Sequence, residues 1–312
     1  MAEGADSVVS LEGLIGRLRR SRRLKLILFL SPGLTVLIIF FFSPFIFSLL
    51  FSLGMFTKTV VDGVSRWVFI PYPELEYYSS FLTSKSTLNS VFQSIYYASV
   101  TTLGTLLLSF PMAYYMALKM DRGTKNIALF LIFLPFWINF LIRVYAIKFI
   151  IHPDGPLSFL LVSIGVLDEG LRILGTDIAV LITMVYSYMI FMLLPVYGVM
   201  EKLNREYIEA AYTLGATPLK TLLRVTIPIV KPGIIAGSLL VFIPAMGEFI
   251  IPIMVGGGRS YPIGRLIYDQ FIRIGPPLGF AYGSAAAMVY IVLIVVSTYL
   301  YFRFVGGEVR LV

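Results

Sequence analysis

Glu248 has the clearest potential for chemistry in this sequence, because its carboxylate lies within an apolar run of about Pro232–Val255. An ionisable group at that depth in a lipid bilayer is costly, and it usually faces a water-filled cavity or a partner. Pro244 and Gly247 just before it predict a kinked helix with freed carbonyl groups. We predict that Glu248 lines a path for a cationic solute. The alternative is a structural carboxylate paired with a basic group such as Arg143.

Two further residues, Asn139 and Trp137, are candidates for the wall of the same path, with packing between helices as the alternative. We expect Arg143, near the end of its apolar run, to reach the membrane surface with its charged head.

The sequence has no cysteine and a single histidine, His152. This excludes disulfides, thiolate catalysis, cysteine metal sites and a zinc site of several histidines. The sequence therefore predicts no catalytic residue and no metal site.

A polar segment, Glu201–Lys231, separates the fourth and fifth apolar runs and has strong local signals. We predict a helix over about Arg205–Leu214, which ends at Gly215, a residue type common just after helices. Thr217 is a natural N-cap and Pro218 a natural first residue for a second helix.

This second helix is expected over about Pro218–Val225, with Leu219, Leu222 and Leu223 on one face. We expect Pro228 and Pro232 to mark its separation from the fifth apolar run. A helix, a break and a second helix between two spans are suited to docking a partner at the membrane surface.

Within this segment, one pattern resembles the coupling-helix signature of permease subunits of ATP-binding-cassette importers: Glu209-Ala210-Ala211, then Gly215, then Val225, Ile227 and Pro228. The resemblance implies that the loop inserts into a groove of an ATPase subunit. By position, Glu209 would face a basic or polar group of the ATPase, and Ala210 and Ala211 would allow close approach. Gly215 would permit the turn into the helix that Pro218 begins. An ordinary helical surface is the alternative.

The resemblance extends over most of the chain. Three more stretches are similar to permeases of the spermidine/putrescine type: Pro135–Ala146, Leu194–Leu203 and Gly237–Phe249. Sister branches that import other small solutes share parts of these stretches, so a permease for another solute stays open.

The elements that must position these residues are membrane spans. The chain is 58% hydrophobic and 13% charged, and its mean hydropathy is +0.89, whereas soluble domains have about a quarter charged residues. Apolar runs of about 18 or more residues can cross a bilayer as helices. We predict an all-α polytopic membrane protein of six spans, at about 26–53, 88–118, 126–142 with an extension to 151, 177–200, 232–255 and 279–304. The resemblance implies the type I fold of ABC-importer permeases.

Basic residues predict the orientation. With the N-terminus in the cytoplasm, the inner segments hold about 16 of the 25 Lys and Arg residues, as the positive-inside rule expects. We therefore predict a cytoplasmic basic segment 1–25, one membrane domain 26–305 with a cytoplasmic coupling loop 201–231, and a cytoplasmic tail 306–312. This distribution beside apolar runs, rather than along a soluble face, argues against a nucleic-acid partner despite the net charge of +8.

The resemblance implies transport by alternating access, without chemistry on the solute. The implied partners are two ATP-binding-cassette subunits, a second homologous permease and an extracytoplasmic substrate-binding protein, besides membrane lipid. ATP would be used by the partner, because no phosphate-binding G-x-x-x-x-G-K-[ST] motif occurs in this chain. Two rival classes predict other features: a transporter driven by an ion gradient predicts charged relays in several spans, and a membrane-embedded enzyme predicts a clustered catalytic set.

Overall fold

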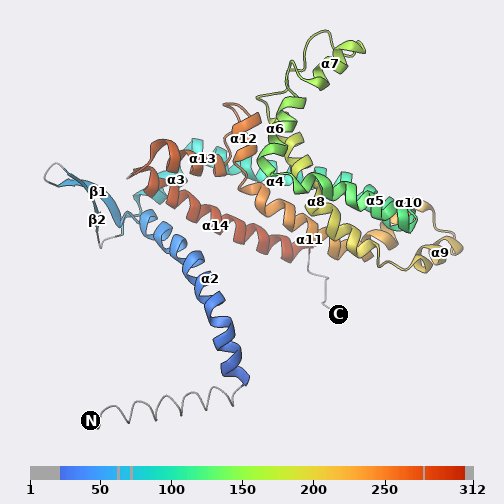
Figure 1. Ribbon diagram of the computed structural model, residues 1–312, viewed down its shortest axis with the longest axis horizontal. Helices are drawn as coiled ribbons and strands as arrows, with labels where there is room; N and C mark the ends of the chain where they lie inside the picture. Colours follow the sequence, from blue (N-terminus) through green and yellow to red (C-terminus); the bar gives the residue numbers. More distant parts are fainter. Residues whose placement is uncertain (1–21, 62–63, 71–72, 277, 306–312) are drawn as a thin grey trace.

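The computed structural model describes residues 22–61, 64–70, 73–276 and 278–305. The predicted segments 1–25 and 306–312 therefore lie largely outside the described residues. Within them the chain is a bundle of long helices from which two arms project (Figure 1). The long helices are α2 (Arg22–Ser52), α4 (Lys85–Leu118), α8 (Asp177–Met200), α11 (Ile227–Met246) and α14 (Leu278–Val305).

Five helices in the described residues are long and apolar enough to cross a membrane, and a bent pair makes a sixth candidate span. The predicted six-span helical fold is thus confirmed. The first of these, α2, diverges from the others in Figure 1 and exposes apolar side chains over most of its surface. Such a helix needs lipid or protein around it.

The predicted third span is present as a bent pair of helices, because it breaks near its middle. Helix α5 (Arg122–Phe133) and the 3-10 turn η1 (Leu134–Trp137) meet α6 (Phe140–Ile150) at 97°. Pro135 sits in the 3-10 turn, and Ile138 is extended with ψ 138°. The Asn139 side chain then begins α6 by accepting the backbone N–H of Leu141 at 2.8 Å.

The predicted fifth span also differs at both of its ends. Helix α10 (Pro218–Thr221) and the π segment η2 (Leu222–Thr226) continue into α11 as one helix, Pro218–Met246. Pro228 therefore lies in the first turn of α11, after a π segment whose wider turn precedes it. At the other end the span stops at Met246, and α12 (Ile250–Val255) follows a break at 247–249. The break falls where Pro244 and Gly247 predicted a kink.

Helices α4, α8 and α11 pack together and hold most of the core. Helix α11 approaches α8 closely, because a Cβ atom at Gly233 would lie 2.6 Å from the Pro195 carbonyl oxygen and one at Gly237 would lie 2.8 Å from the Met192 sulfur. Small residues thus bring the two backbones together, as in membrane helix pairs generally.

The connections at the end of the bundle opposite α9 (Arg205–Thr213) carry additional elements. After α2 comes an antiparallel hairpin of β1 (Phe56–Val61) and β2 (Val64–Phe69), paired from Phe56 with Phe69 to Val61 with Val64. This hairpin was not predicted from the sequence. It precedes α3 (Glu76–Thr83), and α13 (Ile263–Asp269) and the π segment η3 (Gln270–Ile274) pack beside α14.

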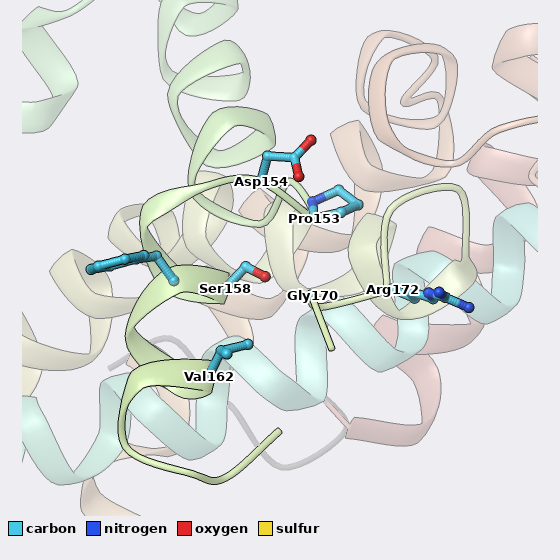
Figure 2. A pocket seen from close by; sticks show the side chains of 7 residues that line it. Pro153, Asp154, Ser158, Val162, Gly170 and Arg172 are labelled. Atoms are coloured by element: carbon cyan, nitrogen blue, oxygen red, sulfur yellow. The ribbon is translucent and has the colours of Figure 1, made fainter. Parts of the chain in front are cut away.

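Besides the diverging helix α2, a second arm consists of α6 and α7 (Pro156–Ser163), which rise away from the bundle in Figure 1. A cavity of about 440 Å³ lies between α7 and the segment that follows it, and Figure 2 shows Ser158 between the two walls. The Ser158 hydroxyl accepts the backbone N–H of Leu171 at 2.8 Å and so fixes this segment to α7. None of the predicted site residues lines this cavity.

Candidate functional site

The predicted helix, break and helix at the end of α8 are confirmed by the structure. Asn204 caps α9 by accepting the backbone N–H of Glu206 at 3.1 Å. At the other end, Gly215 N–H bonds to Tyr212 O at 2.9 Å and Ala216 N–H to Ala211 O at 3.0 Å. These two bonds form a Schellman motif, which needs the positive φ of +79° that Gly215 adopts.

The second helix starts as the sequence predicted. Thr217 is the N-cap of α10, and its hydroxyl accepts the backbone N–H of Lys220 at 3.4 Å. Pro218 occupies the first position, where its missing N–H costs no helical hydrogen bond. Since α10 continues into α11, one unbroken helix leads from the turn at Gly215 into the fifth span.

The predicted coupling residues lie on the surface of this segment. Glu209, Ala210, Gly215 and Pro218 are exposed, and Ala211 is half-buried. Large apolar or aromatic side chains are exposed around them: Tyr207, Tyr212, Leu214, Leu219 and Leu223. We call these residues, together with the predicted coupling residues, the α9–α10 surface. Exposed side chains of this kind, next to a close-approach Ala-Ala pair, are typical of a protein–protein contact.

The α9–α10 surface is fixed to the bundle rather than suspended from it. Leu203 is buried, and Ile208 of α9 packs against the core. The neighbouring connection at the same end is held by an ion pair between Lys125 Nζ and Glu201 Oε1 at 3.3 Å. The segment is therefore anchored to the helices of the bundle.

Glu248 lies in the break between α11 and α12 and is 7% exposed. Its Oε1 accepts the backbone N–H groups of Ile250 at 2.8 Å and Ile251 at 3.2 Å, at the start of α12. Its Oε2 accepts the Tyr188 hydroxyl of α8 at 2.5 Å. Among the described residues no ion pair joins Glu248 to Arg143, so the alternative of a pair between these two residues is not observed.

Close contacts support the backbone break beside Glu248. A Cβ atom on Gly247 would collide with the Tyr290 hydroxyl of α14, and one on Gly264 of α13 would collide with the Gly247 carbonyl oxygen. The two glycines therefore allow α13 and α14 to pack directly on the break. Tyr188 and Tyr290 were missed by the sequence analysis, although a hydroxyl inside an apolar span is a signal that a polar partner is near.

Among the described residues, no hydrogen bond or ion pair joins Glu248 to any of the three residues predicted around the third span. Arg143 is 8% exposed, and its guanidinium lies over the rings of Phe136 at 5.0 Å and Phe140 at 5.6 Å. The prediction that it reaches the surface is wrong, because the bend at η1 turns it inward. Asn139 caps α6, and Trp137 is 75% exposed. No hydrogen bond or ring contact in the described part of the chain joins Trp137 or Asn139 to Glu248.

A second polar cluster, also missed, lies at the end of the bundle opposite α9. Asp177, the first residue of α8, accepts hydrogen bonds from Tyr97 of α4 at 2.5 Å and Ser260 at 2.9 Å. Nothing in its sequence surroundings linked these three residues. In the part of the chain that the structure describes, no group of three His, Cys, Asp or Glu residues could hold a metal ion.

Residues 109–307 match the family model described as binding-protein-dependent transport system inner membrane component. A spermidine/putrescine transport system permease protein, PotB of Escherichia coli, is 38% identical over 210 residues, which are 67% of this chain and 75% of that protein. PotB of Haemophilus influenzae is 38% identical over 213 residues, 68% of this chain and 73% of its own. The sulfate permease CysT of Salmonella typhimurium is 31% identical over 39% of this chain and 43% of its own.

Solved structures share the fold at low identity. A bacterial ABC transporter for the import of the acidic polysaccharide alginate superposes with a TM-score of 0.75 at 15% identity, over 95% of this chain and 99% of that one. The MetNI methionine ABC transporter gives a TM-score of 0.53 at 16% identity, over 73% of this chain and 100% of its own. These matches confirm the type I permease fold that the sequence predicted. The chain belongs to the family of inner membrane components of binding-protein-dependent transport systems.

Proposed function

We propose that this chain is a permease subunit that forms the pathway for a polyamine in an ATP-driven importer. The observation that carries the proposal is the α9–α10 surface, an ordered helix, turn and helix that continues directly into a membrane span. The 38% identity to spermidine/putrescine permeases supports the substrate class. The shared fold does not support this substrate class, because the transporter that superposes with a TM-score of 0.75 is involved in the import of an acidic polysaccharide.

Coupling is the role proposed for Glu209, Ala210, Ala211, Gly215 and Pro218. A groove on an ATPase subunit would receive α9, with the exposed Glu209 carboxylate facing a basic or polar group. Closure of two ATPase subunits on ATP would displace the loop. Because α10 and α11 form one helix, that displacement would move the fifth span and the break that holds Glu248.

The proposed orientation places the α9–α10 surface and both termini in the cytoplasm, as the distribution of Lys and Arg favours. The other proposed partners are a second homologous permease and an extracytoplasmic binding protein at the opposite end. One solved relative of the fold is a complex with a periplasmic protein bound to an alginate pentasaccharide. The ATPase would be a separate subunit.

The absence of cysteine makes the orientation testable. Single cysteines at Leu214, 88% exposed on the α9–α10 surface, and at Glu169, 70% exposed on the opposite connection, can be labelled in whole cells. A membrane-impermeant maleimide is expected to label Glu169→Cys in intact cells and Leu214→Cys only after permeabilisation. The reverse labelling pattern would place the α9–α10 surface outside the cell, where a cytoplasmic ATPase could not bind it.

The proposed path role of Glu248 needs its charge rather than only its hydrogen bonds. The carboxylate is buried against α8 and α12, at a break where a helix movement would uncover it. The rival class, transport driven by an ion gradient, calls for relays of buried charges. Among the described Asp, Glu, Lys and Arg residues, Arg143 is the one buried within a candidate span, and Glu248 is buried in the break just after the fifth span. This rival also gives no role to the α9–α10 surface.

A further inference from the structure

A cavity of about 380 Å³ lies at the end of the bundle opposite α9, apart from Glu248. One wall is a single face of α4, formed by Asn89, Phe92, Gln93 and Tyr96 at helical spacing. The other lining residues are Asp177, at the start of α8, and Arg259, in the loop between α12 and α13.

The carboxylate in this cavity is held in place from behind. Asp177 Oδ1 accepts the hydroxyl of Tyr97 at 2.5 Å and that of Ser260 at 2.9 Å. Tyr97 is 1% exposed and Ser260 is fully buried, whereas Asp177 itself is exposed. The network thus fixes one carboxylate oxygen. The hydrogen bonds of the described residues leave the other oxygen without a partner.

The amide on the opposite wall is fixed in the same way. Gln93 donates from Nε2 to the Tyr97 hydroxyl at 3.0 Å and to the Arg259 carbonyl at 3.2 Å. Its Oε1 accepts the backbone N–H of Tyr261 at 2.7 Å. These bonds join α4, α8 and the loop before α13, so the cavity walls are ordered before any ligand arrives.

The chemistry of the walls matches a protonated amine. A carboxylate provides the counter-charge, and the exposed rings of Phe92 and Tyr96 favour a cation over their faces. The Asn89 side chain offers an amide oxygen that accepts hydrogen bonds. Arg259 has the opposite effect: its cation competes with an amine for Asp177.

We propose that this cavity binds the primary ammonium group of an aliphatic amine at Asp177, with Arg259 as the competing cation. This inference rests on the proposed function, because the proposed orientation places the cavity on the outer side of the membrane. There the cavity would bind the amine before the amine enters the path at Glu248. The alternative is that Arg259 binds a ligand through the ligand's own carboxylate. The variants Asp177→Asn and Arg259→Gln, which change the charge of the site, distinguish the two cases.

The test is equilibrium binding of radiolabelled putrescine to the assembled importer in lipid nanodiscs, without ATP or binding protein. Asp177→Asn keeps an oxygen that accepts from Tyr97 and Ser260 but removes the charge, and it is expected to weaken binding about fivefold. Arg259→Gln is expected to tighten binding about twofold to fivefold. Glu169→Gln, an exposed carboxylate elsewhere on the same side, is the control and should leave binding unchanged.

Phe92→Leu provides a second test if Asp177→Asn fails to fold, because Phe92 is 72% exposed and its loss removes a ring from the site without disturbing the core. A weakening of about threefold is expected. Unchanged binding in Asp177→Asn and Phe92→Leu, or weaker binding in Arg259→Gln, would overturn the proposal.

Uptake measured in parallel separates this site from the proposed function. If the importer accumulates putrescine while binding ignores Asp177 and Phe92, the cavity is not the amine site and the function stands. If no amine is taken up but putrescine binding still depends on Asp177, the site stands and the proposed function fails.

Discussion

The Tyr188 hydroxyl of α8 donates a hydrogen bond to the Glu248 carboxylate at 2.5 Å, from 60 residues away in the chain. The other oxygen of this carboxylate accepts the first backbone N–H groups of α12. One side chain therefore fixes the break in the fifth span to the helix beside it. Under the proposed coupling, a movement of α11 would break these bonds and uncover the Glu248 carboxylate.

Glu248→Gln should fold and assemble but lose most uptake. Glutamine keeps an oxygen for the α12 N–H groups and an amide that can donate to the Tyr188 oxygen, but it removes the charge that the path is proposed to need. Assembly is measured by co-purification with the ATPase, and uptake with radiolabelled spermidine. Full uptake by Glu248→Gln would refute the path role.

Glu248→Leu tests the structural role of the same residue. Losing the hydrogen bonds to α12 and Tyr188 should lower the unfolding free energy by about 2–4 kcal/mol, because buried donors lose their acceptor. Tyr188→Phe keeps the ring and removes one donor, so it should cost less. Thermal unfolding in detergent should show the wild type as the most stable protein, then Tyr188→Phe, then Glu248→Leu. Equal stability of these three proteins would contradict the structural role.

Gly215→Val should uncouple ATP use from transport. Valine at a φ of +79° costs on the order of 1–3 kcal/mol, so the Schellman turn between α9 and α10 would rearrange. Gly165→Val is a matched control, since Gly165 has a φ of +72° in the connection after α7 and no atom within 4 Å of an added Cβ. We expect the ratio of uptake to ATP hydrolysis to fall only in Gly215→Val.

Gly233→Ala should destabilise the bundle more than Gly237→Ala. The Cβ at Gly233 meets the backbone oxygen of Pro195 at 2.6 Å, whereas the nearest atom at Gly237 is the sulfur of Met192, which can move. A loss of about 1–3 kcal/mol is expected for Gly233→Ala. Gly198→Ala, on α8 with nothing within 4 Å, is the control in the same thermal assay. Equal effects at the three positions would contradict the close contact of α8 and α11.

The pH dependence at the start of α5 follows from its cap. The Thr124 hydroxyl, at 2.6 Å, and its backbone N–H, at 3.0 Å, hold the pKa of Asp121 below its ordinary value. A lowered folded-state pKa stabilises the fold above the unfolded pKa, and this contribution is lost as pH falls through the folded value. Asp121→Asn keeps the cap without the titration, so its acid unfolding curve should be flatter than that of the wild type. Identical curves would contradict this assignment.

The loop at 201–218 was predictable because its signals are local. Thr217, Pro218 and Gly215 each act on backbone groups a few residues away, and the structure places them as N-cap, first helical residue and turn. The hairpin of β1 and β2 was not predicted, although the sequence holds a local signal for it: the Asp62-Gly63 pair between two runs rich in valine and aromatic residues.

The remaining features depend on contacts between distant parts of the chain. Apolar composition alone does not distinguish a straight third span from one that bends by 97° after Pro135. The burial of Arg143 follows from that bend. The bond between Tyr188 and Glu248 and the cluster of Tyr97, Asp177 and Ser260 join separate helices, so hydropathy and spacing contain no information about them.

The coupling proposal is tested most directly by uptake of radiolabelled spermidine into proteoliposomes that hold the permease pair and its ATPase, with the binding protein present and no ion gradient. Spermidine is expected to accumulate only when ATP is supplied. Uptake should be lost in Glu209→Arg, on the α9–α10 surface, and retained in Glu169→Arg, a charge reversal at the opposite end. Accumulation driven by an imposed ion gradient without ATP, or full ATP-dependent uptake by Glu209→Arg, would contradict it.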